Sequence, residues 1–198
     1  MRPRRRVLPR AVPRALVAVL VSLFVLAGCD SLGGTNDGGY VPGDGRVLQI
    51  APGDRGEPIE LAEKTLEGDP LDVADLRGQV VVVNTWWSGC PPCRTEMPML
   101  TRAAKELAGE ASFVGINIRD SSAAQGLAFQ RNLGVSYPSI YSPGGEALLA
   151  FSGKVSPAAV PSTAVLDEQG RVAAVISGAI PSQLTLTDLV HEVAGDDG

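Results

Sequence analysis

The feature that most constrains the fold is a run of β-branched and aromatic residues from Gln79 to Trp87 (Gln-Val-Val-Val-Val-Asn-Thr-Trp-Trp). Gly78 and Gly89 bound the run, and it lacks the alternation of apolar and polar residues that marks a half-exposed strand. A short continuous apolar run is typical of a strand that is buried on both faces. Such a strand needs a covering layer on each side, which predicts an α/β architecture.

Strand-like and helix-like segments alternate after this run. The expected strands are residues 112–118, 162–166 and 171–177, and the expected helices start after Pro92 (ending near Gly109), at Ser121 (to Leu133) and at Ser182 (to Ala194). Apolar residues of the first helix recur at spacings of three and four, at Met97, Leu100, Ala104 and Leu107. A tight turn joins the last two strands into an antiparallel hairpin, and Ile59–Leu61 with Leu71–Asp72 are candidates for an N-terminal hairpin. This order predicts a central mixed β-sheet flanked by helices.

The first 28 residues have the parts of a secretory signal peptide. They contain six arginines and no acidic residue, and Ala15–Ala27 is almost wholly apolar. As a helix this apolar stretch would rise about 20 Å, which is short of the roughly 30 Å that a bilayer core requires. We therefore expect residues 1–28 to be a leader that is removed on export.

The leader ends in Leu26-Ala27-Gly28-Cys29, which resembles the lipobox of bacterial lipoproteins. The resemblance implies cleavage before Cys29 and lipid on its sulfur, with several acyl chains holding the protein at a membrane face. The alternative is a secreted protein with an unmodified thiol at Cys29. Residues 29–45 are rich in glycine and poor in bulky apolar side chains, which predicts a flexible tether. Residues 46–198 remain for one folded domain.

Charge is distributed unevenly along the chain. Six of the 17 basic side chains lie in the leader, so 11 remain against all 22 acidic ones, a net charge of −11. A body this acidic repels phosphate backbones, and we expect no nucleic-acid partner. The hydrophobic content of 44% is too high for a disordered chain.

Two cysteines, in the motif Cys90-Pro91-Pro92-Cys93, lie directly after the predicted buried strand and at the start of a predicted helix. The first helical turn has backbone N–H groups without intrahelical partners and a partial positive charge, and both stabilise a thiolate. We expect Cys90 to be the exposed nucleophile that attacks a substrate disulfide. Cys93, one turn inward, would be more buried and would resolve the mixed disulfide. No cofactor beyond the redox-active Cys90–Cys93 disulfide is then needed.

Other interpretations of this cysteine pair are weaker. A structural disulfide would close only a short loop and so constrain the unfolded chain little. A zinc site needs four ligands, and no second cysteine pair exists, so we expect no metal. Covalent haem attachment needs a histidine after the second cysteine, where this chain has Arg94.

The segment Asn84–Pro98, which contains the cysteine pair, resembles the active-site segment of the TlpA/ResA-type thiol-disulfide oxidoreductases. Val160–Asp167, followed by Gly170-Arg171-Val172, is similar to the segment of that family that carries a cis proline. The resemblance covers about residues 47–194. It implies a thioredoxin-like fold with an N-terminal β-hairpin and a central helix-strand insertion between Asn117 and Lys154.

The resemblance also implies roles for four further residues. Pro161 would be the cis proline that faces the cysteine pair, and it would turn the backbone of Val160 toward the substrate chain. Glu96, one helical turn after Cys93, would carry the Cys93 proton, and partial burial would raise its pKa. Trp86 would pack near the site and contact substrate. The plain alternatives are a trans proline, a solvated glutamate and a tryptophan of the core.

One position departs from the family pattern. The family usually has tryptophan directly before the first cysteine, whereas this chain has Gly89, with Trp87 two residues earlier. This leaves open whether Trp87 fills the gap in the surface that meets substrate. Pro91 and Pro92 remove two amide donors from the helix start, which indicates a less stabilised thiolate and hence a reductant.

These features predict a membrane-anchored, extracytoplasmic thiol-disulfide oxidoreductase that reduces protein disulfides, as relatives do in cytochrome c maturation. Its partners would be protein disulfide substrates, a membrane electron donor that restores the dithiol, and the membrane through the lipid at Cys29. A disulfide-forming oxidase of the same fold and a non-catalytic protein-binding module are the alternatives. A peroxiredoxin is disfavoured, because Trp87 stands where those enzymes place threonine or serine.

Overall fold

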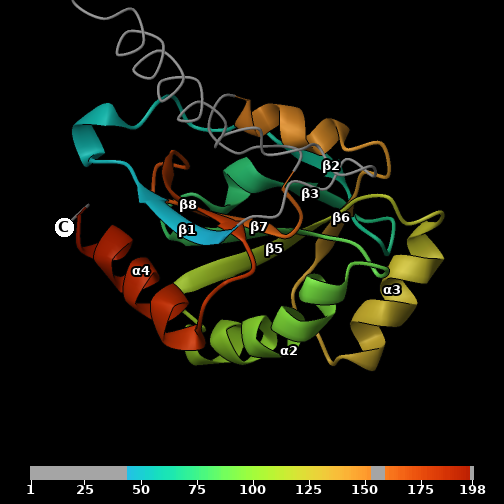
Figure 1. Cartoon of the computed structure of the whole chain (residues 1–198). Coiled ribbons are helices and arrows are strands. Elements are labelled where there is room, and N and C mark those ends of the chain that lie inside the picture. Colours follow the sequence, from blue (N-terminus) through green and yellow to red (C-terminus); the bar gives the residue numbers. More distant parts are fainter. Residues whose placement is uncertain (1–43, 153–158, 197–198) are drawn as a thin grey trace, which may run out of the picture. The chain divides into compact units, whose positions relative to one another are not determined.

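The structure is a computed structural model, and it describes residues 44–152 and 159–196 (Figure 1). A six-stranded sheet in the order β1-β8-β7-β4-β5-β6 forms its centre. The strands are β1 (Asp44–Gln49), β4 (Val80–Trp86), β5 (Ala111–Asn117), β6 (Ser139–Tyr141), β7 (Ser162–Leu166) and β8 (Val172–Gly178). Strands β4, β5 and β6 run parallel, and the β4–β7, β7–β8 and β1–β8 pairs are antiparallel. The mixed sheet and the C-terminal hairpin expected from the sequence are confirmed.

Strand β4 is buried along its whole length. Val80 and Val82 pack in one apolar core, and Val81 and Val83 pack in another. Successive side chains of a strand point to opposite faces, so each face of β4 belongs to a different core. The prediction of a strand buried on both faces is confirmed.

Two long helices cover one face of the sheet, below it in Figure 1. The helices of the domain are α2 (Pro91–Glu106), α3 (Ala123–Asn132) and α4 (Gln183–Gly195), and α2 and α4 form this layer. Met97, Leu100 and Leu107 are buried as predicted. Ala103 is buried, whereas Ala104 is only half-buried. At this point the predicted buried position of α2 is therefore wrong by one residue.

Shorter elements cover the opposite face. They are the two-stranded sheet of β2 (Ala62–Lys64) and β3 (Pro70–Asp72) and the 3-10 helices η2 (Val73–Leu76) and η3 (Glu146–Phe151), and a further one, η1 (Pro52–Asp54), follows β1. Val73, Leu148 and Phe151 pack on this side with Val81 and Val83. The insertion expected after Asn117 is present as α3, β6 and η3.

The N-terminal elements differ in part from the expectation. Leu71–Asp72 lies in β3 as predicted, but its partner strand is β2, and Ile59–Leu61 precedes that strand. The backbone of Ile59–Leu61 bonds elsewhere, because Ile59 N donates to Gly170 O and Leu61 O accepts from Val73 N. Strand β1 starts at Asp44, inside the segment predicted to be a tether. It forms through backbone pairing with β8, which the glycine-rich sequence does not reveal.

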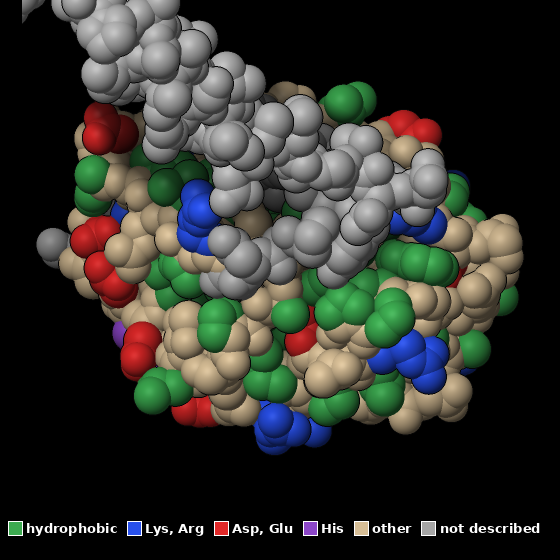
Figure 2. All heavy atoms as spheres, viewed as in Figure 1, with side chains coloured by type: hydrophobic (Ala, Val, Ile, Leu, Met, Phe, Trp, Pro, Cys, Tyr) green, Lys and Arg blue, Asp and Glu red, His purple; other side chains and the backbone are tan. Residues whose placement is uncertain are grey.

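The leader, Cys29 and almost all of the tether lie outside the described residues, so they stay predictions. Within residues 44–152 and 159–196, no helix is long and apolar enough to cross a membrane. Figure 2 shows the Lys and Arg side chains of the described residues in separate places on one face, without a continuous basic surface.

A buried ion pair fastens the start of the domain to its end. Arg55 Nη1 lies 3.2 Å from Asp167 Oδ2, and both side chains are almost fully buried. Arg171 Nε also contacts this carboxylate at 2.7 Å, and Arg55 Nη2 contacts Asp196 Oδ2 at 2.6 Å. The loop after β1, the turn between β7 and β8 and the residue after α4 therefore meet at Arg55.

We expect Asp167→Ala to lower the free energy of unfolding by about 3 kcal/mol, because it leaves a buried guanidinium without one of its partners. Glu60→Ala is the control, since the Glu60–Arg77 pair is solvent-exposed and such pairs contribute less than about 1 kcal/mol. Urea unfolding measures both changes. An Asp167→Ala loss no larger than that of the control would contradict the expectation.

Candidate active site

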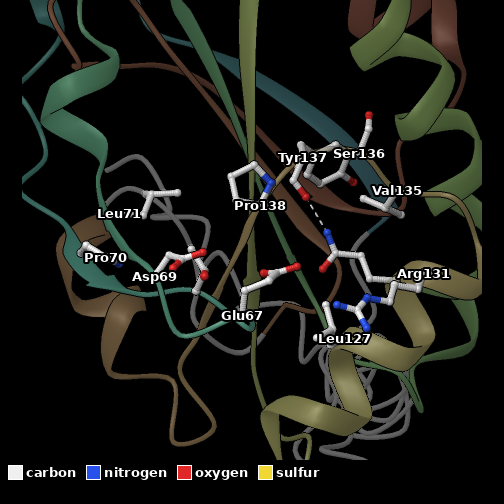
Figure 3. A pocket seen from close by; sticks show the side chains of 12 residues that line it. Glu67, Asp69, Pro70, Leu71, Leu127, Arg131, Val135, Ser136, Tyr137 and Pro138 are labelled. Carbon is white, nitrogen blue, oxygen red and sulfur yellow. Dashed lines mark hydrogen bonds between the residues drawn. The ribbon is translucent and has the colours of Figure 1, made fainter.

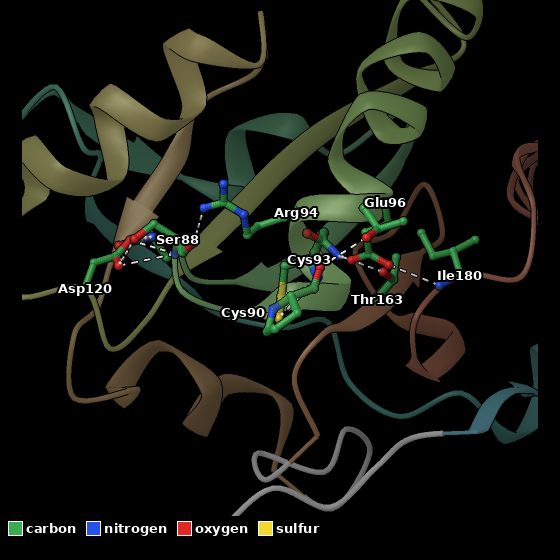
Figure 4. The surroundings of a disulfide bond; sticks show 12 residues. Ser88, Cys90, Cys93, Arg94, Glu96, Asp120, Thr163 and Ile180 are labelled. Carbon is green, nitrogen blue, oxygen red and sulfur yellow. Dashed lines mark hydrogen bonds between the residues drawn. A yellow bond between two sulfur atoms is a disulfide. The ribbon is translucent and has the colours of Figure 1, made fainter.

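The two cysteines lie where the central strand leads into the first long helix (Figure 4). Cys90 is the N-cap of α2, and Cys93 lies in its first turn. Their sulfurs form a disulfide with an S–S distance of 1.96 Å and a Cα–Cα distance of 5.3 Å. The backbone N–H of Cys93 donates to Cys90 Sγ at 3.2 Å. Because Pro91 and Pro92 have no N–H, Cys93 supplies the first free amide of the helix to this sulfur.

Both cysteines are buried. Cys93 is 0% exposed, as expected, but Cys90 is only 2% exposed, so the expectation of an exposed Cys90 is wrong for this oxidised form. Cys90 belongs to the same apolar cluster as Met97 and Val160, and the disulfide turns its sulfur toward Cys93. A substrate must therefore reach Cys90 at a closely packed surface.

The Val160–Pro161 peptide bond is cis, as the family resemblance implies, and it lies directly before β7. The Pro161 carbonyl accepts from Gly178 N at 3.0 Å. Among the described residues, none forms a hydrogen bond with the backbone of Val160. Within the described residues, this backbone therefore has a donor and an acceptor without partners, in the same apolar cluster as Cys90. Substrate binding by Val160 and Pro161 stays a prediction.

The Glu96 carboxylate lies behind the disulfide and is 5% exposed. Asn84 Nδ2 donates to Glu96 Oε1 at 3.0 Å, and Ile180 N donates to Oε2 at 3.1 Å. The same Asn84 nitrogen donates to Thr163 Oγ1 at 3.0 Å (Figure 4). One amide side chain of β4 therefore links the helix that carries Cys93 to the strand that follows the cis proline.

Burial raises the pKa of Glu96 from 4.5 to about 7, and the hydrogen bonds from Ile180 and Asn84 act in the opposite direction because they favour the charged form. The predicted rise in the Glu96 pKa is confirmed. A carboxyl that titrates near neutrality can both accept and return a proton at ordinary pH.

A second polar cluster, which the sequence analysis did not predict, holds the turn before Cys90. Both oxygens of the buried Asp120 carboxylate accept from Ser88 N, and Asp120 Oδ1 also accepts from Ser88 Oγ at 2.6 Å. Asn117 Nδ2 and Gln125 Nε2 donate to the same carboxylate. Ser88 and Asp120 follow two neighbouring parallel strands, whose carboxyl ends meet at one edge of the sheet. Their positions directly after these strands are the sequence signal that could have predicted the contact.

Arg94 joins this cluster to helix α2. Its Nη1 donates to the Ser88 carbonyl at 3.1 Å, and its guanidinium lies over the Phe129 ring, 5.1 Å from the ring centre. Arg94, at the position where a haem-attachment motif has histidine, therefore connects the turn before Cys90 to α3.

Trp86 is a core residue. Its side chain is 0% exposed, its Nε1 donates to Ser139 Oγ at 3.2 Å, and its ring packs on Phe129 with centroids 5.7 Å apart. The expectation that Trp86 contacts substrate is wrong, because β6 and α3 enclose its indole. Figure 4 instead shows Glu96 and Thr163 on one side of the cysteines, and Asp120 with Ser88 on the other side.

The hollows of the described surface include a groove beside the cysteines and a cavity away from them. A groove of about 370 Å³ beside the first turn of α2 is lined by Pro92, Thr95, Glu96, Met99 and the segment 179–182, so it reaches the buried carboxyl. A cavity of about 390 Å³ between the β2–β3 turn and α3 is lined by Glu67, Asp69, Gln130 and Arg131 among others (Figure 3). Neither cysteine lines this cavity, and the cavity shares no lining residue with the groove beside α2. Within the described part of the chain, no group of three or more His, Cys, Asp or Glu side chains is placed to hold a metal ion.

The chain matches the Redoxin family model over residues 51–191. It belongs to the Redoxin family. The TlpA/ResA-type resemblance agrees with this Redoxin match, because the chain is 27% identical over 118 residues to thiol-disulfide oxidoreductase ResA of Bacillus subtilis. That alignment covers 59% of this chain and 63% of ResA, so the match spans less than two thirds of the relative's length.

Solved structures of similar proteins support the thioredoxin-like fold of this Redoxin-family chain. A DsbF homologue from Corynebacterium diphtheriae is 32% identical with a TM-score of 0.70, and the match covers 80% of this chain and 99% of that one. A secreted thiol-disulfide isomerase from Corynebacterium glutamicum is 31% identical with a TM-score of 0.71, covering 84% and 100%. The predicted fold class is confirmed.

The raised pKa of Glu96 predicts a pH-dependent stability. Its carboxyl binds a proton more tightly in the folded chain than in the unfolded one, so its contribution is fully present below about pH 4.5 and is lost as pH rises through about 7. Between pH 5 and pH 8, the free energy of unfolding should fall by on the order of 2 kcal/mol more in the wild type than in Glu96→Gln. Urea unfolding at both pH values tests this, and equal pH dependence of the two proteins would contradict it.

Proposed function

We propose that this protein is a thiol-disulfide oxidoreductase that passes two electrons from the Cys90–Cys93 dithiol to protein disulfides. The observation that carries the proposal is the cysteine pair at the N-terminus of α2, with the cis Val160–Pro161 bond before the neighbouring β7 and a neutral-range carboxyl behind it. The names of the relatives support the same chemistry, since ResA is called a thiol-disulfide oxidoreductase.

The first step is attack by the Cys90 thiolate on one sulfur of a substrate disulfide. The substrate S–S bond breaks, one substrate thiolate leaves with the electron pair, and a mixed disulfide forms. Cys93 then loses its proton and attacks Cys90 Sγ, which releases the second substrate thiolate. The substrate gains two electrons and the protein ends with the Cys90–Cys93 disulfide.

Glu96 is the proposed acceptor of the Cys93 proton. It lies one helical turn after Cys93, and its pKa of about 7 lets the carboxylate take a proton and return it to solvent. The groove lined by Glu96 and Pro92 supports this role, because it provides a way for that proton to leave. Asn84 positions the carboxylate through its hydrogen bond to Oε1.

Val160 is the proposed backbone contact for the substrate chain. Its N–H and C=O lack partners among the described residues, and the cis bond to Pro161 sets their direction. An extended substrate segment paired with this backbone would bring its disulfide to Cys90 by β-strand addition.

Reduction is the proposed direction. Only one described N–H group, that of Cys93, donates to Cys90 Sγ, which supports a thiolate less stabilised than that of a strong oxidant. Apocytochrome c disulfides are the proposed substrates and a membrane dithiol protein the proposed electron donor, on the family resemblance alone.

Replacing Cys93 by alanine should trap substrates, because the mixed disulfide on Cys90 then has no resolving thiol. We expect disulfide-linked complexes of the full-length Cys93→Ala protein in cells, identified by mass spectrometry after non-reducing separation. The Cys90→Ala/Cys93→Ala protein, which keeps Cys29, is the matched control. Equal complex formation by the two proteins would refute the proposed nucleophile.

The midpoint potential of the Cys90–Cys93 pair tests the direction. A value near about −270 mV, as in thioredoxin, supports reduction, and a value near about −120 mV supports the disulfide-forming oxidase. Failure of the wild type to reduce insulin with dithiothreitol would favour the non-catalytic binding module.

We propose an extracytoplasmic location with a lipid anchor at Cys29. The sequence of the leader supports export, and the relative from Corynebacterium glutamicum is called secreted. Labelled palmitate should enter the wild type but not Cys29→Ala, and the variant should leave the membrane fraction. Ser31→Ala, two residues away, is the control. Labelling of Cys29→Ala to the wild-type level would contradict the anchor.

A further inference from the structure

The turn that leads into Cys90 is short, and a backbone hydrogen bond closes it. Strand β4 ends at Trp86 and Cys90 caps α2, so Trp87, Ser88 and Gly89 alone connect them. Cys90 N donates to the Trp87 carbonyl at 3.1 Å. Gly89 is exposed, and Trp87 is half-buried against the apolar cluster that contains Cys90. The Trp87 side chain is therefore packed against this cluster and partly exposed to solvent.

The Trp87 ring lies directly on the α-carbon of Gly89. A Cβ atom built at position 89 would lie 2.2 Å from Trp87 Cζ3, 2.7 Å from Cη2 and 2.9 Å from Cε3. Real Cβ atoms essentially never approach another heavy atom within 3.0 Å. Any side chain at position 89 would thus have to move the indole. Trp87 occupies the place into which a residue directly before Cys90 would point.

The turn cannot relax easily, because Ser88 is bonded through all its polar atoms. Its N–H and hydroxyl donate to Asp120, which is 1% exposed, and its carbonyl accepts from Arg94 Nη1. Gln125 Nε2 also donates to Ser88 Oγ at 2.9 Å. These bonds hold the backbone on both sides of Ser88, and the Trp87 side chain packs from this turn against the apolar cluster that contains Cys90.

We infer that the Trp87 indole, placed by Gly89, is the contact surface for the polypeptide that carries a substrate disulfide, and that it makes the protein favour protein disulfides over small ones. This inference rests on the proposed thiol-disulfide function. A chain bonded to the attacked sulfur extends past position 89 and can stack on the exposed part of the ring, whereas a small disulfide ends before it. Half-buried aromatic rings are efficient contacts because they are rigid and largely apolar.

The test compares two substrates of the reduced full-length protein. Insulin is the protein disulfide and hydroxyethyl disulfide is the small one, and thiol alkylation with mass spectrometry gives the rate constant for each. Trp87→Ala and Gly89→Ala should lower the insulin rate constant about tenfold and leave the hydroxyethyl disulfide rate constant within about twofold. Trp87→Phe, which keeps an aromatic ring, should lose less with insulin than Trp87→Ala.

Three controls separate this effect from damage to the fold or to the thiols. Leu48→Ala removes an exposed apolar side chain on the edge strand β1 and should change neither rate constant. The midpoint potential of the cysteine pair should stay at the wild-type value in every variant. In Gly89→Ala, acrylamide quenching of tryptophan emission should rise, because the ring of Trp87 is displaced while Trp86 stays buried.

Two results would overturn the inference. One is an unchanged insulin rate constant in both Trp87→Ala and Gly89→Ala. The other is an equal fall with both substrates accompanied by a shifted midpoint potential, which would place the effect on the thiols. If Trp87→Ala does not fold, Gly89→Ala and Trp87→Phe still decide the question. A wild type that reacts with neither disulfide would instead refute the proposed function.

Discussion

Strand β4 is paired along both edges and buried on both faces, and the position of every group in the site follows from that constraint. Its carboxyl end is the place where the chain can leave the sheet, and α2 begins three residues later with Cys90 at its cap. Asn84, inside the strand, faces Glu96 of α2 and Thr163 of β7. A strand less firmly held would let the cysteines, the carboxyl and the cis peptide move independently.

Two carboxylates serve this end of the sheet in different ways. Glu96 has two hydrogen-bond donors, and burial still moves its pKa to about 7, so it is a group that can change charge. Asp120 is also buried, and it accepts hydrogen bonds from Ser88, Asn117 and Gln125, so it ties the turn before Cys90 to the end of β5 and the start of α3.

The sequence analysis predicted the elements and the site residues that depend on a local sequence pattern. The β-branched run, the helix-capping serines and the Cys-Pro-Pro-Cys motif gave β4, α3, α4 and the disulfide at the start of α2. Residues whose roles depend on distant partners were missed or misassigned. Strand β1 exists because β8 offers an edge, Trp86 is enclosed by Ser139 and Phe129, and Asp120 meets Ser88 across the sheet end. The resemblance to the TlpA/ResA-type oxidoreductases, in contrast, correctly placed the cis bond at Val160–Pro161.

The contact between Trp87 and Gly89 makes these two positions mutually dependent. A tryptophan introduced at position 89, as in the usual family pattern, collides with the indole already there, so it is tolerated only after position 87 has become small. That order of substitution passes through a chain with an aromatic ring at neither position. Homologues should accordingly carry the bulky group at one position or the other, and the pair should covary as a single unit through the history of the lineage.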